Sequence, residues 1–171
     1  VPLTTLDKNG NKIENGEIPV AIELSSLKIN KEDFTMTKGT SETLTVTGTP
    51  AEALEGQTIT WKSSNKDVVT VDSKGKVEAV GVGNATITAT AAGKSDSVKI
   101  TVNNPLKKIT VDPATLTLKK GTSKTLSVKY DPADTTDNKA VTWESSDKSV
   151  ATVDANGKVT ALKDGSATIT A

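Results

Sequence analysis

Oxygen-bearing side chains near the start of the chain have a spacing that could bind a hard cation. Asp7, Asn9 and Asn11 occupy the first, third and fifth positions of a calcium-loop pattern. The pattern then fails, because Lys12 stands where such a loop needs glycine and Ile18 where it needs a bidentate glutamate. Since the flanks also lack a helical pattern, the favoured interpretation is a hairpin turn at Asn9, and no metal site is predicted here.

A second acidic segment, Asp131–Asp137, carries carboxylates at Asp131, Asp134 and Asp137. Together they could hold a cation. Thr49 takes the place of the first carboxylate in the related loop of the first half, and Asp, Pro and Thr are the usual residues of turns. A solvated loop between strands is therefore the favoured interpretation, with cation binding as the alternative.

The composition excludes most catalytic chemistry. The 171 residues include no cysteine and no histidine, and all 21 basic residues are lysines. A thiol nucleophile, a disulfide, a Cys/His zinc site and a Ser-His-Asp triad are therefore impossible. No pair among the 21 acidic residues is marked out for glycoside hydrolysis. We predict no enzyme activity, no catalytic residue, no cofactor and no bound metal.

The charge pattern also limits the partners. The net charge is zero and the lysines are spread along the chain, so no basic stripe for nucleic acid is present. Lysines on exposed strands discourage edge-to-edge pairing, and this protective role is the favoured interpretation. Attraction of the lysines to an anionic wall polymer or DNA is the alternative. No stretch approaches the about 18 apolar residues of a membrane span, so we expect no membrane insertion, and any export signal is expected outside the given chain.

The chain repeats itself with an offset of 82 residues. When residues 39–89 are placed on 121–171 without a gap, 27 of 51 positions are identical. A period of this length exceeds the roughly 20–50 residues of a solenoid unit and suits a small domain. The sequence therefore predicts two copies of one domain, joined end to end.

Each copy has the pattern of short β-strands. Apolar residues alternate with polar ones in Thr43–Thr47 and Ser97–Val102, and glycine-containing turns separate such runs. Seven or so short strands in about 80 residues are typical of a β-sandwich. In the first copy, strands are expected near 24–30, 34–37, 41–47, 57–63, 67–71, 76–80, 84–91 and 95–102. In the second copy, they are expected near 106–112, 115–118, 122–130, 140–145, 149–153, 158–162 and 166–171.

Trp61 and Trp143 lie in the middle strand of each copy, where a large apolar side chain is expected between two sheets. A sugar-stacking surface is the alternative. Apolar residues of the neighbouring strands complete the predicted core. They are Leu44, Ile59, Val71, Val77 and Ile87 in the first copy and Leu126, Val141, Val153, Val159 and Ile169 in the second.

The segment Val141–Ala171 closely resembles the bacterial immunoglobulin-like group 2 domain of invasin- and intimin-like proteins, and Ile59–Ala89 matches it too. The shared features are Trp, Ser-Ser, Val-Asp, Gly-Lys-Val and Ala-Thr-Ile. The resemblance implies two tandem immunoglobulin-like β-sandwiches without disulfides, an all-β fold with no catalytic residue to carry over. It also implies a tandem module of a bacterial cell-surface or phage virion protein.

The predicted organisation is an N-terminal connector or hairpin over 1–20, a first Ig-like domain over 21–103 and a second over 104–171. We call the two domains unit 1 and unit 2. Only Asn103–Pro105 separates their strands, and Pro105 restricts its own φ and that of the preceding residue. So short a link is stiff compared with a Gly/Ser tether, and end-to-end sandwiches joined in this way are expected to form a rod.

The last strand of the first copy, near 95–102, would have its counterpart at 177–184, past Ala171. Unit 2 is therefore expected to lack its final strand in the given chain (C-terminally truncated). Its 165–171 strand should then expose backbone groups and part of the core. We expect the missing residues to exist in the parent protein, a strand to come from elsewhere, or unit 2 to be less ordered.

The predicted function is a non-enzymatic structural stalk or decoration of a larger bacterial cell-surface or phage virion (tail or head) protein, aiding surface attachment. The expected partners are other domains of the same polypeptide or of the surface or virion assembly. The main alternative is an adhesin module that binds a cell-surface glycan or host protein. An accessory region of an extracellular enzyme is a further alternative.

Overall fold

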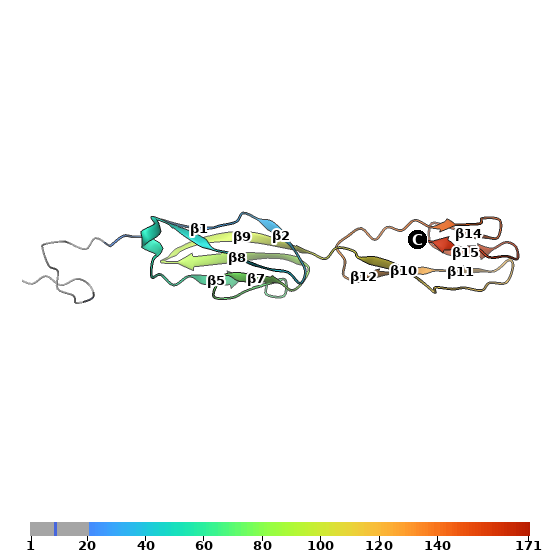
Figure 1. Ribbon diagram of the computed structural model, residues 1–171, viewed down its shortest axis with the longest axis horizontal. Coiled ribbons are helices and arrows are strands. Elements are labelled where there is room, and N and C mark those ends of the chain that lie inside the picture. Colours follow the sequence, from blue (N-terminus) through green and yellow to red (C-terminus); the bar gives the residue numbers. More distant parts are fainter. Residues whose placement is uncertain (1–8, 10–20) are drawn as a thin grey trace, which may run out of the picture.

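The computed structural model describes Asn9 and residues 21–171. Figure 1 shows two β-rich bodies placed end to end along the long axis of the molecule. The strands of unit 1 lie in one body and those of unit 2 in the other, so the prediction of two tandem all-β sandwiches is confirmed.

One sheet of unit 1 has the strand order β2-β9-β8-β5. Its longest strands are β8 (Gly83–Ala91) and β9 (Lys94–Asn103), which pair along their whole length. β5 (Thr60–Ser63) borders β8, and β2 (Phe34–Thr37) runs parallel to β9. The segment at 83–91 alternates buried and less buried side chains, as a strand with one face in a core should.

The opposite side of unit 1 is formed by two smaller sheets. β3 (Ser41–Thr43), β7 (Lys76–Ala79) and β6 (Val69–Val71) form one, in the order β3-β7-β6. β1 (Ser26–Ile29) pairs with β4 (Val46–Thr49) in the other.

The single strand predicted over 41–47 is two strands in the structure. β3 ends at Thr43 and pairs with β7, whereas β4 begins at Val46 and pairs with β1. Between them, the amide of Leu44 donates to the carbonyl of Gly75 and the amide of Asn30 donates to the carbonyl of Thr45. The chain thus changes partner within one apolar run, which alternation alone does not reveal.

The core of unit 1 lies between these sheets. Ile29, Leu44, Ile87 and Ile100 are at most 1% exposed, and four valines of β6, β7 and β9 are equally covered. A helical turn not predicted from the sequence, η1 (Ala51–Leu54), closes one end and buries Ala53. Its Leu54 packs against the core.

The prediction that both tryptophans are buried is wrong in degree. Trp61 in β5 packs against the core, and Trp143 lies just before β13, but both are only half-buried. Each lies over a turn glycine: a Cβ on Gly75 would come within 2.9 Å of the Trp61 ring, and one on Gly157 within 2.7 Å of the Trp143 ring. The rings therefore cover the margin of the sandwich rather than its centre, and the centre is filled mainly by isoleucine and valine.

Unit 2 repeats most of unit 1 at the 82-residue offset. β10 (Lys108–Asp112) pairs with β12 (Ser127–Asp131), as β1 does with β4. β11 (Ser123–Thr125), β15 (Lys158–Ala161) and β14 (Ala151–Val153) repeat the three-stranded sheet. β13 (Glu144–Ser145) pairs with β16 (Ile169–Thr170).

The strand predicted over 115–118 is absent from unit 2, and β13 and β16 are shorter than predicted. In unit 1, the equivalent strand β2 pairs only with β9. Within the described part of unit 2, no strand takes the place of β9, so residues 115–118 have no partner from which to form a ladder. The prediction that unit 2 lacks its final strand is thereby confirmed for these residues.

Of the predicted core of unit 2, Leu126 and Val159 are buried. Val141, Val153 and Ile169 are only half-buried, as are Ile59 and Val71 in unit 1.

Candidate functional site: the junction between the two units

The link between the units is short and is held at both ends. β9 ends at Asn103, whose carbonyl accepts a hydrogen bond of 2.8 Å from the amide of Lys38 in unit 1. The next residue, Asn104, is only 8% exposed although its side chain is polar. Pro105 then limits the backbone of both Asn104 and itself, so the chain leaves unit 1 in a restricted direction.

The acidic loop Asp131–Asp137 follows β12 at the end of unit 2 that faces the link. The amide of Thr135 donates to the carbonyl of Pro132 at 3.1 Å, and the Thr135 side chain is 8% exposed. Its hydroxyl accepts a hydrogen bond from the amide of Asp137. The Lys139 ammonium donates to the carbonyl of Ala133 at 2.8 Å. All of these bonds lie within unit 2, so the loop has a defined shape that does not depend on its contact with unit 1.

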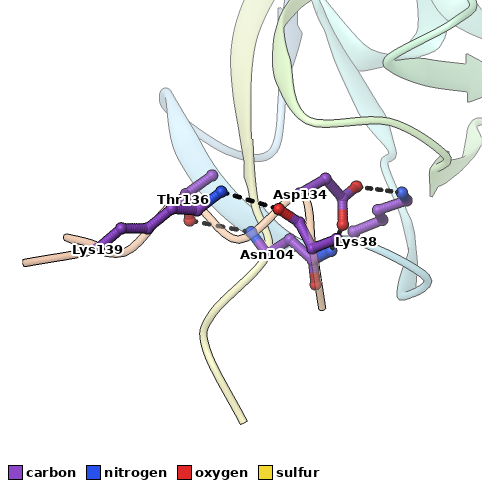
Figure 2. Close-up of polar contacts among 6 residues, drawn as sticks. Lys38, Asn104, Asp134, Thr136 and Lys139 are labelled. Atoms are coloured by element: carbon purple, nitrogen blue, oxygen red, sulfur yellow. Dashed lines mark hydrogen bonds and ion pairs between the residues drawn. The ribbon is translucent and has the colours of Figure 1, made fainter. Parts of the chain in front are cut away.

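Asp134 is the residue of this loop that joins the two units (Figure 2). Its Oδ2 accepts a bond of 2.6 Å from the ammonium of Lys38, and its Oδ1 accepts one of 2.7 Å from the side-chain amide of Asn104. Asn104 and Thr136 add a reciprocal pair: the Asn104 amide donates to the Thr136 hydroxyl at 3.1 Å, and the Thr136 amide donates to the Asn104 carbonyl at 2.9 Å. We call Lys38, Asn104, Asp134 and Thr136 the junction clamp.

Both oxygens of Asp134 are therefore used by donors. The hydrogen bond from Lys38 is the largest cause that lowers the pKa of Asp134 below its usual value, and the charge of Lys38 and the bond from Asn104 act in the same direction. Partial burial opposes them. The carboxylate is thus held in its charged form, in which it can accept both bonds.

The other two acidic residues of the loop also bond to the chain near the link. Asp137 accepts a 2.7 Å hydrogen bond from the amide of Leu106, and the backbone carbonyl of Asp131 accepts one from the amide of Lys107. In the part of the chain that the structure describes, no group of three or more acidic residues is placed to hold a metal ion. The loop instead ties the link to both units.

The other candidate cation segment falls mostly outside the description. Asp7 and Asn11 lie outside the described residues, and Asn9 is in a turn and exposed. The interpretation of that segment stays a prediction.

Sequence reasoning identified the acidic loop but missed Lys38 and Asn104 as its partners. Neither residue belongs to a recognisable motif. The usable signal was the three-residue link, because so short a connection brings the first loops of unit 2 against the last turns of unit 1. Chemically, an ammonium, a carboxylate and an amide that satisfy one another can hold two bodies together.

Among the described residues, no helix is long and apolar enough to cross a membrane.

The sequence has relatives of different kinds. It is 32% identical over 155 residues to ice-binding protein 1 of Shewanella frigidimarina, covering 86% of this chain and 17% of that protein. It is 41% identical over 105 residues to a lacto-N-biosidase of Bifidobacterium bifidum, covering 60% and 9%. It is 39% identical over 80 residues to the minor capsid protein of Enterobacteria phage T3, covering 46% and 18%. The chain thus spans less than a fifth of the length of these relatives.

Two solved structures illustrate the structural similarity. A mutant of intimin from EHEC O157:H7 aligns at 24% identity with a TM-score of 0.37, covering 52% of this chain and 51% of that one. Domains 5–6 of the S-layer protein SbsC align at 19% identity with a TM-score of 0.40, covering 85% and 89%.

The sequence profile of one domain family matches the chain twice, over residues 24–102 and 105–171. These two matches meet at the junction clamp and together take in both β-rich bodies. The chain therefore belongs to the bacterial Ig-like domain (group 2) family, of which it carries two non-catalytic domains in tandem.

Proposed function

We propose that this chain is a stiff spacer within a larger extracellular bacterial or phage virion protein. It holds the parts on either side of it at a fixed distance and orientation. The observation that carries this proposal is the junction clamp, in which Asp134 of unit 2 bonds to Lys38 of unit 1 and to Asn104 of the link.

The clamp adds to the stiffness of the link itself. A proline-containing link of three residues limits bending, but it leaves rotation between two bodies partly free. The contact between Lys38 and Asp134 joins the two units directly, outside the covalent link, so it opposes rotation about the link. The side chains of the pair are 37% and 50% exposed, so water and salt weaken it. It need not hold two separate molecules together, because the chain already keeps its partners close.

The range of relatives supports a spacer. The similar segment occurs in proteins named as an ice-binding protein, a lacto-N-biosidase and a minor capsid protein. In each case it is less than a fifth of the whole protein. A segment shared by proteins with such different names is better suited to positioning other domains than to any one of their activities.

One feature favours the alternative function of a glycan-binding adhesin module. A hollow of about 250 Å³ beside half-buried Trp61 is lined by Leu44, Ile59 and Lys74, among others. Tryptophan rings can stack on sugars, but this ring lies against the turn at Gly75. We expect tryptophan fluorescence to stay unchanged when bacterial wall glycans are added. Saturable quenching, lost in Trp61→Phe, would favour the adhesin function instead.

The spacer proposal is tested by the distance between the units. Lys62 and Glu144 are exposed and occupy equivalent positions of the two units, and the chain has no native cysteine. Spin labels on Lys62→Cys and Glu144→Cys should give one narrow distance distribution by pulsed electron resonance. Lys38→Ala or Asp134→Ala should broaden it.

Lys120→Ala is the matched control, because Lys120 occupies the position in unit 2 that Lys38 occupies in unit 1. It should leave the distribution narrow. A broad distribution in the unchanged chain would refute the spacer.

A further inference from the structure

Unit 1 receives the chain at one end and releases it at the other. β1 begins at Ser26, at the end away from unit 2, and β9 ends at Asn103, where the link to unit 2 starts (Figure 1). A pull along the rod therefore reaches unit 1 through the residues before β1 and after β9. The contacts between the entering segment and β9 decide how unit 1 responds to that pull.

The entering segment lies parallel to β9. β2 pairs with β9 in a parallel register that places Phe34 opposite Ile100. The amide of Lys38 adds a hydrogen bond of 2.8 Å to the carbonyl of Asn103. Because the two strands run the same way, a pull that enters before β2 and leaves after β9 draws them past each other along their length. The hydrogen bonds of such a ladder are evenly spaced and share the load, so they must break together.

Two carboxylates extend this attachment beyond the ladder. Asp33, just before β2, accepts a 2.8 Å hydrogen bond from the amide of Lys99. Asp96, near the start of β9, accepts one of 2.7 Å from the amide of Ile29, the last residue of β1. β1 pairs with β4 and, among the described residues, forms no ladder with β9. Asp96 therefore ties to β9 a strand that belongs to the other side of the sandwich.

The attachment is shielded from water on its inner side. Met36 lies opposite Val102 in the ladder, and the two residues are 6% and 1% exposed. Ile29, whose amide donates to Asp96, is also 1% exposed. A hydrogen bond in surroundings of low dielectric constant is stronger than one in water. Water is thus poorly placed to replace these bonds one after another as they loosen.

The entering segment, rather than β9, is the part that detaches first. β9 pairs with β8 along its whole length, but with β2 only over its last four residues, Ile100–Asn103. The shorter ladder is the weaker of the two. Its strength, with that of the bonds to Asp33 and Asp96, therefore sets the resistance of unit 1 to a pull.

We propose that unit 1 bears tension along the rod, and that residues 29–38 and residues 96–103 of β9 form the contact that carries the load. We call these two segments the shear clamp. A pull on opposite ends of unit 1 loads all bonds of the shear clamp at once, whereas a pull on both segments at the same end opens them one at a time. The inference goes beyond the spacer, because it concerns the load that unit 1 resists and not the orientation of the two units.

The test pulls single molecules of the 1–171 chain in an optical trap. The chain has no native cysteine, so thiol handles can be placed at chosen positions. Handles on Ala21→Cys and Lys107→Cys, both exposed, load unit 1 from end to end and place most of unit 2 beyond the loaded segment. Handles on Ala21→Cys and Lys94→Cys pull at one end only, because Lys94 begins β9 at the end away from the link. At equal force, unit 1 should unfold at least about tenfold more slowly in the first geometry.

Variants identify the bonds that carry the load in the end-to-end geometry. Asp96→Ala should raise the unfolding rate at constant force about tenfold, because the hydrogen bond that it removes would otherwise have to break at the barrier. Asp33→Ala removes the more exposed bond and should raise the rate about threefold. Asp96→Asn keeps an oxygen that can accept from the amide of Ile29, so its unfolding rate should stay close to that of the unchanged chain.

Ser63→Ala is the matched control. The Ser63 hydroxyl donates to the carbonyl of Val69, which joins β5 to β6 outside the shear clamp. This bond stays formed while the shear clamp breaks, so its loss should lower the equilibrium stability in urea without raising the unfolding rate under load.

The proposal is overturned if the two pulling geometries give equal unfolding rates, or if Asp96→Ala and Ser63→Ala raise the rate alike. Should Asp96→Ala fail to fold, the comparison of Asp33→Ala with Ser63→Ala decides in the same way. A broad spin-label distribution together with a shear clamp that resists load would refute the spacer alone.

Discussion

Unit 1 and unit 2 share 27 of 51 aligned residues but differ in how much of that sequence is in strands. Residues 83–91 form a nine-residue strand, whereas the equivalent region of unit 2 contains only the two-residue strand β16. The alternation of Ala, Thr and Ile is the same in both. β8 lies between β9 and β5, whereas β16 pairs only with β13 within the described residues. A paired strand on each side is therefore what allows this alternating sequence to form a long, buried strand.

The largest difference between the units is expected when the same side chain is removed from each. Ile87 is fully buried and its equivalent Ile169 is half-buried. Ile87→Ala should lower the free energy of unfolding of unit 1 by about 2–5 kcal/mol, because it leaves a cavity in a closed core. Ile169→Ala should cost unit 2 about 1–2 kcal/mol, because its side chain buries less surface.

Calorimetry of the two variants measures both costs, since each unit carries one change. Equal losses would mean that the core of unit 2 is as closed as that of unit 1 in solution. The comparison of burial would then be wrong.

How far the sequence predicts this structure depends on which contacts are local. The repeat, the turns and most strand positions follow from alternation and glycine placement, and the family follows from the shared motifs around Trp61 and Trp143. The split between β3 and β4 could not be predicted, because both halves continue one alternating run and differ only in their partners. The tryptophans were assigned to the centre of the core because of their size, whereas turn glycines hold them at its margin.

The candidate site was less predictable than the fold. The loop Asp131–Asp137 has the composition of any acidic turn, and Lys38 is 96 residues away from Asp134 in the sequence. Nothing local marks either residue as half of a pair. Lys38 and Asp134 come into contact only because the link orients unit 2 against unit 1. That orientation cannot be read from the sequence around either residue.

A second comparison separates crowding from backbone conformation at the turn glycines. Gly75 and Gly39 both have a positive φ, at 81° and 87°. A Cβ on Gly75 would collide with the carbonyl of Leu44 and the ring of Trp61, whereas one on Gly39 would meet nothing within 4 Å. Gly75→Ala should therefore cost about 2–4 kcal/mol and Gly39→Ala about 1 kcal/mol in urea unfolding. Similar losses would mean that the tryptophan does not rest on the turn.

A smaller effect tests a contact that the two units share. The hydroxyl of Ser63 donates to the carbonyl of Val69, and that of Ser145 donates to the carbonyl of Ala151, both at 2.6 Å. Both serines are nearly buried, at 6% and 5% exposed. Ser63→Ala and Ser145→Ala should each cost about 1–2 kcal/mol, because a buried carbonyl loses its donor. Ser64→Ala is the comparison for unit 1 and should cost less, because the Ser64 hydroxyl, which accepts a hydrogen bond from the amide of Thr86, is exposed to water. A clearly smaller loss of unfolding free energy for Ser145→Ala than for Ser63→Ala would mean that β13 is less firmly packed than β5.

The smallest effect on stability is expected at the junction clamp. There the quantity to measure is the distance between the two units rather than the free energy of unfolding. The pKa of Asp134 is lowered in the folded chain, mainly by the hydrogen bond from Lys38. A carboxylate with a lowered folded-state pKa contributes its interaction above its unfolded-state pKa and loses it as the pH falls through the folded-state value. The clamp should thus be intact at neutral pH and open only below the ordinary aspartate pKa of 3.8.

Acidification below that value should broaden the spin-label distance distribution between positions 62 and 144, while each unit keeps its far-ultraviolet circular dichroism. In Lys38→Ala, the distribution should already be broad at neutral pH and change little with acid. In Asp134→Asn, the side-chain amide can still meet Asn104 but cannot pair with the ammonium, so it should be broad across the whole range. If Asp134→Asn kept the narrow distribution at every pH, the reciprocal bonds between Asn104 and Thr136 would be enough to orient the units. The ion pair would then be incidental to the rod.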